Sequence, residues 1–188
     1  KYVLTDPVEY YLSGLTDTPL TEQFIKPVQG SPFGLNRFPV SVSAAGILRA
    51  LLASKAPCNI LLYGQPGTGK TEFAKSVIAS AGGQACFMQR YQRKDSRADA
   101  AAGEMAHLRA ALYLLPGETG VLVVDEADTL LNTRYFTFGL NRSPDKGQTN
   151  EFLDQAQAKI IWITNESGYI EESTLRRFAF SLHFKAFS

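Results

Sequence analysis

Residues 61–74, which read LLYGQPGTGKTEFA, constrain the fold of this chain more than any other stretch. An apolar run leads into a loop from Gly64 to Thr71 that fits the pattern G-x-x-x-x-G-K-[ST]. The stretch therefore predicts a buried strand, a tight loop and a helix in succession. Glycines let several backbone N–H groups converge on one anionic point, and the N-terminal end of the helix adds its positive dipole. We expect the loop to hold a polyphosphate.

Every residue of this loop is a candidate for nucleotide binding. Lys70 is expected to reach the β- and γ-phosphates, and the Thr71 hydroxyl is expected to ligate Mg²⁺. The rest of the loop would surround the phosphates with its backbone: Gly64, Gln65, Pro66, Gly67, Thr68 and Gly69.

Apolar runs of strand length alternate with helical patterns along much of the chain. Strands are predicted at 58–63, 84–91, 120–128, 159–164 and 178–184, and the main helices at 41–55, 71–83, 97–115 and 149–155. Strands that are apolar on both faces and separated by helices indicate a mostly parallel sheet covered on both sides. The expected fold class is α/β with three layers.

Two of these helices carry candidate capping residues. Ser41 or Ser43 can cap the helix at 41–55, whose apolar stripe starts at Ile47. The helix at 149–155 is expected to begin at Thr149 or Asn150.

Two acids stand at the end of a buried apolar strand. Asp125 and Glu126 end the run VLVVDE, and ligands bind where the strands of a parallel sheet end. Asp125 is predicted to hold the Mg²⁺ shell, and Glu126 to accept a proton from the attacking water or to orient it. Neighbouring side chains on a strand face opposite ways, which would give the two acids different tasks. With Asp128 they also suit the N-terminus of a following helix, and both interpretations can hold.

Polar groups follow two further segments. Asn165 comes at the end of the strand IIWIT, where a neutral amide can hydrogen-bond both the water and the γ-phosphate. Arg176 and Arg177 close a short helix before the last strand. An arginine pair there suits the helix C-terminus, but a guanidinium is also the group that a transferring phosphate needs.

The length of the chain and its net charge bear on the number of domains and on binding to nucleic acid or membranes. The chain has 188 residues and a net charge of +1, which suits one main domain and provides no overall field toward nucleic acid or an anionic membrane. A local basic cluster, Arg90, Arg93, Lys94 and Arg97 around Tyr91, is either a solvated loop or a binding surface. No apolar run is long enough for a membrane span, and the first residues lack the basic-then-apolar order of a signal peptide, so we expect a cytoplasmic protein.

The cysteines and histidines show no ligand or catalytic spacing. Cys58 and Cys86 lie in apolar, strand-like runs and are expected to be reduced core residues. His107 and His183 have no partner pattern, and we interpret both as structural.

Four landmarks in fixed order, GQPGTGKT, VLVVDEAD, ITN and LRRF, resemble those of the AAA+ ATPases over residues 40–188. The resemblance implies ATP and Mg²⁺ as ligands and a five-stranded parallel sheet, with the Asn165 strand between the phosphate-loop strand and the acidic strand. It also implies a ring of subunits, commonly six, in which Arg176 or Arg177 acts on a neighbour's nucleotide. The arginine pair is adjacent, and Ala179 stands where the family often has Asp, so the acting arginine stays open.

The same resemblance predicts two parts of the chain, an N-terminal segment and a nucleotide-binding domain. Residues 1–39 hold five of the nine prolines and are expected to form an extended arm or linker, which either wraps the core or leads in from another domain. Residues 40–188 would form the nucleotide-binding domain, without the small helical lid that normally follows in this family. Because the chain starts at Lys1 and stops at Ser188, we expect a fragment of a longer protein, monomeric in dilute solution and weakly active.

The function that follows is ATP binding and hydrolysis with Mg²⁺, coupled in the full-length oligomer to remodelling of a protein or another macromolecule. An alternative is a nucleotide-dependent switch or loader acting on DNA or RNA, which the basic cluster would favour. A scaffold with a vestigial site is a third alternative. The complete set of Lys70, Asp125, Glu126 and Asn165 argues against a scaffold.

Overall fold

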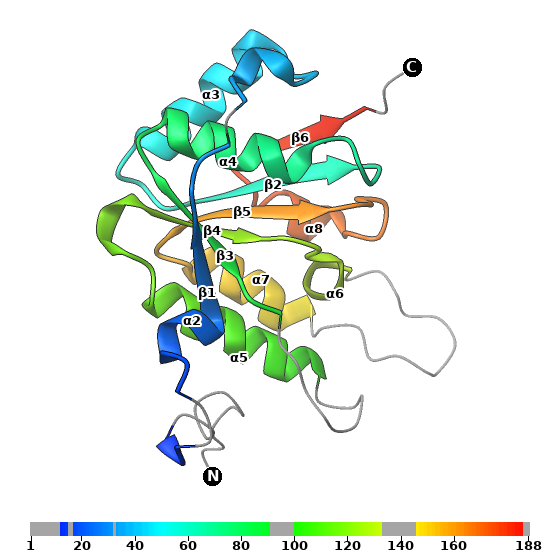
Figure 1. Ribbon diagram of the computed structural model, residues 1–188. Coiled ribbons are helices and arrows are strands. Elements are labelled where there is room, and N and C mark those ends of the chain that lie inside the picture. Colours follow the sequence, from blue (N-terminus) through cyan, green and yellow to red (C-terminus); the bar gives the residue numbers. More distant parts are fainter. Residues whose placement is uncertain (1–11, 15–16, 32, 91–99, 133–145, 186–188) are drawn as a thin grey trace.

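The computed structural model of the chain (Figure 1) describes residues 12–14, 17–31, 33–90, 100–132 and 146–185. Its centre is a six-stranded sheet with the strand order β1-β3-β4-β5-β2-β6. The strands are β1 (Ile25–Val28), β2 (Cys58–Gly64), β3 (Gln84–Met88), β4 (Gly120–Val124), β5 (Lys159–Thr164) and β6 (Phe180–Phe184). All neighbouring strands are parallel except β1, which pairs antiparallel with β3. The predicted α/β fold with a mostly parallel sheet is confirmed.

The sheet has one strand more than the five expected, and this strand comes from the segment predicted to be an extended arm. Phe24 and Ile25 are both 1% exposed, so residues 20–28 pack as part of the core and wrap around it. Pro27 does not prevent this because β1 is an edge strand, where one side of the backbone needs no sheet partner.

Helices cover both faces of the sheet. In Figure 1, α3 and α4 lie on one face, and α2, α5 and α7 lie on the other. The helices are α2 (Leu20–Phe24), α3 (Val42–Ala53), α4 (Lys70–Ser80), α5 (Ala100–Tyr113), α6 (Asp128–Leu131), α7 (Lys146–Gln155) and α8 (Glu172–Leu175), with short 3₁₀ turns η1 (Leu35–Arg37) and η3 (Gly117–Thr119). None of the helices in the described part is long and apolar enough to cross a membrane.

Each face of the sheet has its own hydrophobic core. Phe73 of α4 packs edge-on against Phe184 of β6 in the core beneath α3 and α4. In the other core, Trp162 of β5 packs edge-on against Phe152 of α7. The indole N–H of Trp162 donates to Asn59 Oδ1 at 3.0 Å, so these two buried polar groups satisfy each other.

The predicted start of α3 is confirmed, whereas one residue of its predicted buried face and the predicted start of α7 are wrong. Ser41 caps α3, since its hydroxyl accepts the Ala44 N–H at 3.2 Å. Ile47, predicted to lie on the buried stripe, is 47% exposed, so that prediction is wrong. The predicted start of the later helix at Thr149 or Asn150 is also wrong, because α7 begins at Lys146 and the Thr149 hydroxyl donates to the Leu130 carbonyl.

The cysteines lie in the sheet as free thiols. Cys86 is buried and Cys58 is partly buried, and burial raises the pKa of both thiols. This agrees with their interpretation as reduced core residues.

The strand order decides where the candidate site lies. Strand β5 lies between β2 and β4, as the resemblance implied. The carboxyl ends of these three strands are therefore neighbours, and the phosphate loop, the two acids and Asn165 follow them directly.

Candidate functional site

The phosphate loop joins the end of β2 to the start of α4. Gly67 and Gly69 have φ angles of 78° and 88°, a backbone state that other residues adopt only with strain. Gly64, with φ of 141°, lies so close to β6 that a Cβ there would be 2.2 Å from the Phe184 carbonyl oxygen. The glycines of the motif are thus required by the shape of the loop itself.

Polar contacts inside the loop hold Lys70 at its mouth. The Lys70 ammonium donates to the carbonyl oxygens of Gly64 at 2.6 Å and Gln65 at 2.9 Å, and to Asn165 Oδ1 at 3.2 Å. The Thr68 hydroxyl closes the loop by donating to the Gln65 carbonyl at 2.8 Å. The residue expected to meet the phosphates is therefore held in place by oxygen atoms alone.

Two opposing influences act on the Lys70 charge. The residue is only 5% exposed, and this burial lowers the pKa of its ammonium. The nearby carboxylates of Asp125 and Asp128 act in the opposite direction and favour the charged form. The site thus holds a buried cation between acids, beside a loop of backbone N–H groups.

The two predicted Mg²⁺ ligands are in direct contact. The Thr71 hydroxyl donates to Asp125 Oδ2 at 2.9 Å, across 54 residues of sequence. Mg²⁺ is usually held by one or two carboxylates together with substrate phosphates and water. The donor set at this edge fits that ion, with Thr71 and Asp125 as its protein contacts.

Glu126 adopts an unusual backbone conformation. Strand β4 ends at Val124, so both acids lie in the turn that follows, and Glu126 has a φ of 54°. Its N–H donates to Asp125 Oδ1 at 2.9 Å. The expectation that strand alternation separates the two acids is therefore wrong, and the left-handed turn sends them in different directions instead. Such strained residues concentrate at functional sites.

Arg90 forms an ion pair with Glu126 that the sequence analysis did not predict. The side chains of Arg90 and Glu126 are 76% and 58% exposed, respectively. Arg90 follows β3, so its proximity to Glu126 results from the pairing of β3 with β4. Sequence analysis had placed Arg90 in the basic cluster, whose other members, Arg93, Lys94 and Arg97, lie outside the described residues.

Phe38 is a second residue near the loop that the sequence analysis missed. A Cβ added at Gly69 would be 3.7 Å from the Phe38 ring, which also packs edge-on against Phe73 of α4. The Ser76 hydroxyl fastens the same segment to α4 by donating to the Phe33 carbonyl at 2.9 Å. Phe38 therefore lines one side of the site.

The two candidate arginines make their ion pairs away from the loop. Arg177 donates to Asp154 of α7 at 2.9 Å, and its side chain is 30% exposed. Arg176 pairs with Glu172 of α8 and is 74% exposed. Of the two, Arg176 is the more available to a neighbouring molecule.

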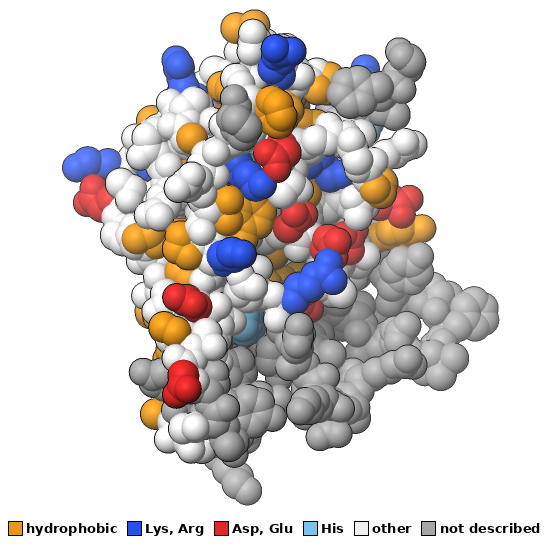
Figure 2. All heavy atoms as spheres, viewed as in Figure 1, with side chains coloured by type: hydrophobic (Ala, Val, Ile, Leu, Met, Phe, Trp, Pro, Cys, Tyr) orange, Lys and Arg blue, Asp and Glu red, His pale blue; other side chains and the backbone are white. Residues whose placement is uncertain are grey.

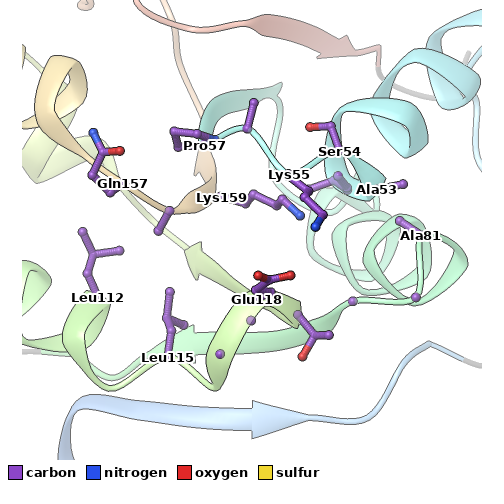
Figure 3. Close-up of a pocket in the computed structure, with 18 residues that line it drawn as sticks. Ala53, Ser54, Lys55, Pro57, Ala81, Leu112, Leu115, Glu118, Gln157 and Lys159 are labelled. Carbon is purple, nitrogen blue, oxygen red and sulfur yellow. The ribbon is translucent and has the colours of Figure 1, made fainter.

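A separate pocket of about 480 Å³ lies where β4 and β5 begin. In Figure 3, Lys55 from the loop after α3, Glu118 from η3 and Lys159 from the start of β5 extend into it. The predicted phosphate-loop residues, the two acids and Asn165 lie at the opposite edge, where β2, β4 and β5 end, so the pocket is not part of the candidate site. On the face shown in Figure 2, acidic and basic side chains are interspersed, without a continuous basic area among the described residues.

Comparison with known protein families gives one match over much of the chain. The model of the "ATPase family associated with various cellular activities (AAA)" matches residues 60–186. The 26S proteasome subunit RPT4 of Saccharomyces cerevisiae is 32% identical over 132 residues, which cover 65% of this chain and 29% of that protein. Fidgetin-like protein 1 of Drosophila melanogaster is 29% identical over 138 residues, 68% of this chain and 25% of that protein. The chain thus spans only a quarter to a third of these two relatives.

Solved structures share the fold at low sequence identity. The crystal structure of the FIGL-1 AAA domain in complex with ADP aligns with a TM-score of 0.59 and 18% identity, over 100% of this chain and 64% of that one. A chain of the E. coli MS115-1 HORMA:CdnC:Trip13 complex aligns with a TM-score of 0.59 and 16% identity, over 89% of this chain and 72% of that one. These likenesses extend the agreement in fold to nearly the whole chain.

Proposed function

The chain belongs to the AAA family of ATPases, and we propose that it binds ATP with Mg²⁺ and hydrolyses the γ-phosphate at the carboxyl edge of its sheet. The observation that carries the proposal is the position of Lys70. Its ammonium is held at the mouth of the glycine loop by backbone oxygens and by Asn165, beside the Thr71–Asp125 pair.

Binding is assigned to the loop and the start of α4. The backbone N–H groups from Gly64 to Thr71 surround the phosphates, and Lys70 neutralises the β- and γ-phosphate charge. Thr71 and Asp125 would hold Mg²⁺, which when bound offsets the negative charge that develops on the phosphate oxygens.

The chemical step is assigned to Glu126 and Asn165. Water attacks the γ-phosphorus in line with the bond to the β–γ bridging oxygen, and that bond breaks as the new P–O bond forms. Glu126 accepts the proton of the water, and the Asn165 amide orients the water against the phosphate. The Arg90 ion pair competes with this role, because its guanidinium occupies one oxygen of the carboxylate that is to accept the proton.

We assign neutralisation of the remaining negative charge on the transferring phosphate to an arginine of a neighbouring subunit. Both candidates make their own ion pairs within α7 and α8, and Arg176 is the more exposed of the two. We therefore assign the role to Arg176 in a ring-shaped oligomer, with Arg177 anchoring α8 to α7. A supplied arginine is worth roughly 10³–10⁵ in rate, so the chain alone should be a weak ATPase.

The role of the whole protein is a broader proposal. Relatives of this family include a proteasome subunit and a protein described as an "Outer mitochondrial transmembrane helix translocase" from Danio rerio, 28% identical over 135 residues. Coupling of hydrolysis to remodelling of a macromolecule is the function these relatives support best. We place the nucleotide-binding domain at residues 40–188, with β1 of the preceding segment completing its sheet.

A substitution of Glu126 tests the chemical assignment. Glu126→Gln keeps the shape of the side chain but cannot accept a proton, so turnover should fall by about 10²–10⁴-fold while ATP still binds. Glu118→Gln, at the opposite edge of the sheet, is the matched control and should behave as the wild type. Nucleotide binding and hydrolysis are measured on the same samples. Equal loss of both in Glu126→Gln would exclude the assigned role.

A further inference from the structure

The hydroxyl of Thr164 makes a short hydrogen bond at the end of β5. Thr164 is fully buried, and its Oγ1 lies 2.6 Å from Asp128 Oδ1 and 3.2 Å from the Glu166 carbonyl oxygen. A hydroxyl has one proton to donate, and the shorter contact with a carboxylate is the stronger. Thr164 therefore donates to Asp128, and its oxygen is left to accept the Glu166 N–H at 3.3 Å.

These two bonds lie on either side of Asn165. The residue before it is fixed to Asp128, and the residue after it is fixed to the Thr164 hydroxyl. Asn165 itself extends to Lys70 with its Oδ1 at 3.2 Å. The direction of the Asn165 amide thus depends on a turn whose hydroxyl is oriented by Asp128.

A backbone contact joins the same two segments. The regular β4–β5 pairing ends at Val124 opposite Trp162, yet the Ala127 N–H still donates to the Ile163 carbonyl at 2.8 Å. The chain after β4 is therefore attached to the end of β5 at two successive residues, Ala127 and Asp128. Glu126 precedes them directly, so its place relative to Asn165 is fixed by these contacts.

The Asp128 carboxylate suits the dipole of its own helix but does not cap that helix. Asp128 is the first residue of α6, which has no side-chain cap. Its carboxylate faces the Thr164 hydroxyl and lies near the Lys70 charge. An acid that only favoured the helix dipole would need neither contact.

From this geometry we propose that Asp128 is a positioning residue for ATP hydrolysis, which sets the relative placement of Glu126 and Asn165 through its hydrogen bond with Thr164. The inference rests on the proposed function, because it concerns the same reaction. It predicts a defect in the chemical step with little change in nucleotide binding, since neither Asp128 nor Thr164 belongs to the phosphate loop.

The test uses single-turnover hydrolysis of radiolabelled ATP, with nucleotide affinity measured alongside. Asp128→Ala and Thr164→Val should each lower the hydrolysis rate by about 10–100-fold, the size of effect that misplacement of reacting groups produces. The affinity for ATP should change by less than about threefold, as expected when an interaction acts mainly in the transition state. Asp128→Asn keeps an oxygen acceptor for Thr164 and should recover most of the rate, which a role through charge alone would not allow.

Two further variants keep the test decisive. The double variant Asp128→Ala/Thr164→Val should be no slower than either single one, because both remove the same hydrogen bond. Thr129→Val is the matched control, since its hydroxyl donates to Glu104 instead, and its rate should equal that of the wild type. Thr164→Ser retains the hydroxyl and should stay active, which separates loss of the bond from misfolding.

The outcomes separate the two claims. A wild-type rate in Asp128→Ala, or losses that multiply in the double variant, would overturn the positioning role while leaving the proposed function intact. Absence of hydrolysis in the wild type under the same conditions would instead overturn the proposed function, and the inference with it.

Discussion

Lys70 shows how one side chain meets the needs of both the fold and the proposed chemistry. Its ammonium has three donors, and three oxygens accept them in this structure, so the buried charge is fully paired. Two of those oxygens are backbone carbonyls of the loop that a phosphate would approach. A bound phosphate can therefore take over these donors without any need to neutralise the lysine first.

Arg90 provides a prediction at the same scale. If the ion pair occupies the Glu126 oxygen that is to accept the proton, Arg90→Ala should raise the basal hydrolysis rate. Exposed ion pairs contribute at most about 1 kcal/mol, so the increase should not exceed about fivefold. Arg109→Ala, an exposed arginine on α5, is the control. A rate that falls in Arg90→Ala would show that Arg90 takes part in the reaction instead of restraining Glu126.

Gly64 provides a prediction for stability. A Cβ at this position would be 2.2 Å from the Phe184 carbonyl oxygen, in a backbone state that costs other residues about 1–3 kcal/mol. Gly64→Ala should therefore lower the free energy of unfolding by at least that amount. Gly46→Ala is the matched control: it lies in α3 with nothing within 4 Å of the added Cβ, and alanine should stabilise the helix by about 0.5–1 kcal/mol. Denaturant unfolding of both variants distinguishes the effects, and an unchanged midpoint in Gly64→Ala would contradict the close approach.

At the scale of elements, the sequence predicted what depends on local pattern and missed what depends on distant partners. The strands β2, β4 and β5 were predicted because each is a continuous apolar run. The strand β1 was missed because its four residues include a proline and only Ile25 is fully buried. Its place in the sheet depends on the partner strand β3, which no spacing in the sequence reveals.

Some features of the candidate site could likewise be predicted from the sequence, and others could not. The loop from Gly64 to Thr71 could be predicted because backbone shape and chemistry are encoded in eight consecutive residues. The contacts of Arg90 with Glu126 and of Thr164 with Asp128 each join residues 36 positions apart. They arise only when β3, β4 and β5 come together, so sequence reasoning could name the acids but not their partners.

The packing of α2 against α5 gives a prediction about pH. His107 of α5 is 1% exposed and lies against the Phe24 ring with centroids 4.5 Å apart, and burial lowers its pKa from the ordinary 6.5. The native state thus keeps this histidine neutral where the unfolded chain already binds a proton. Its contribution to stability is complete above about pH 6.5 and is lost as the pH falls, by up to about 1.4 kcal/mol per pH unit.

Unfolding measured between pH 7.5 and 5 checks this directly. His107→Phe should flatten the fall in stability with decreasing pH, while His183→Phe controls for loss of an imidazole elsewhere. The same slope in His107→Phe as in the wild type would show that other groups cause the pH dependence.

At the scale of the whole molecule, the proposed binding and water-activating residues lie together, and the two candidate arginines lie elsewhere. Lys70, Thr71, Asp125, Glu126 and Asn165 come together within one chain, whereas Arg176 and Arg177 are engaged on α8 and α7. An arginine from a second copy would complete the charge balance around the phosphate. We therefore propose that the active site is formed by residues of two subunits.

Hydrolysis per subunit, measured over a wide range of protein concentration with nucleotide binding on the same samples, tests this claim most directly. The account predicts that ATP binds at every concentration, that the rate per subunit rises as copies associate, and that Arg176→Ala abolishes the rise. A rate per subunit that is substantial and independent of concentration, with Arg176→Ala equal to the wild type, would contradict a site shared between subunits.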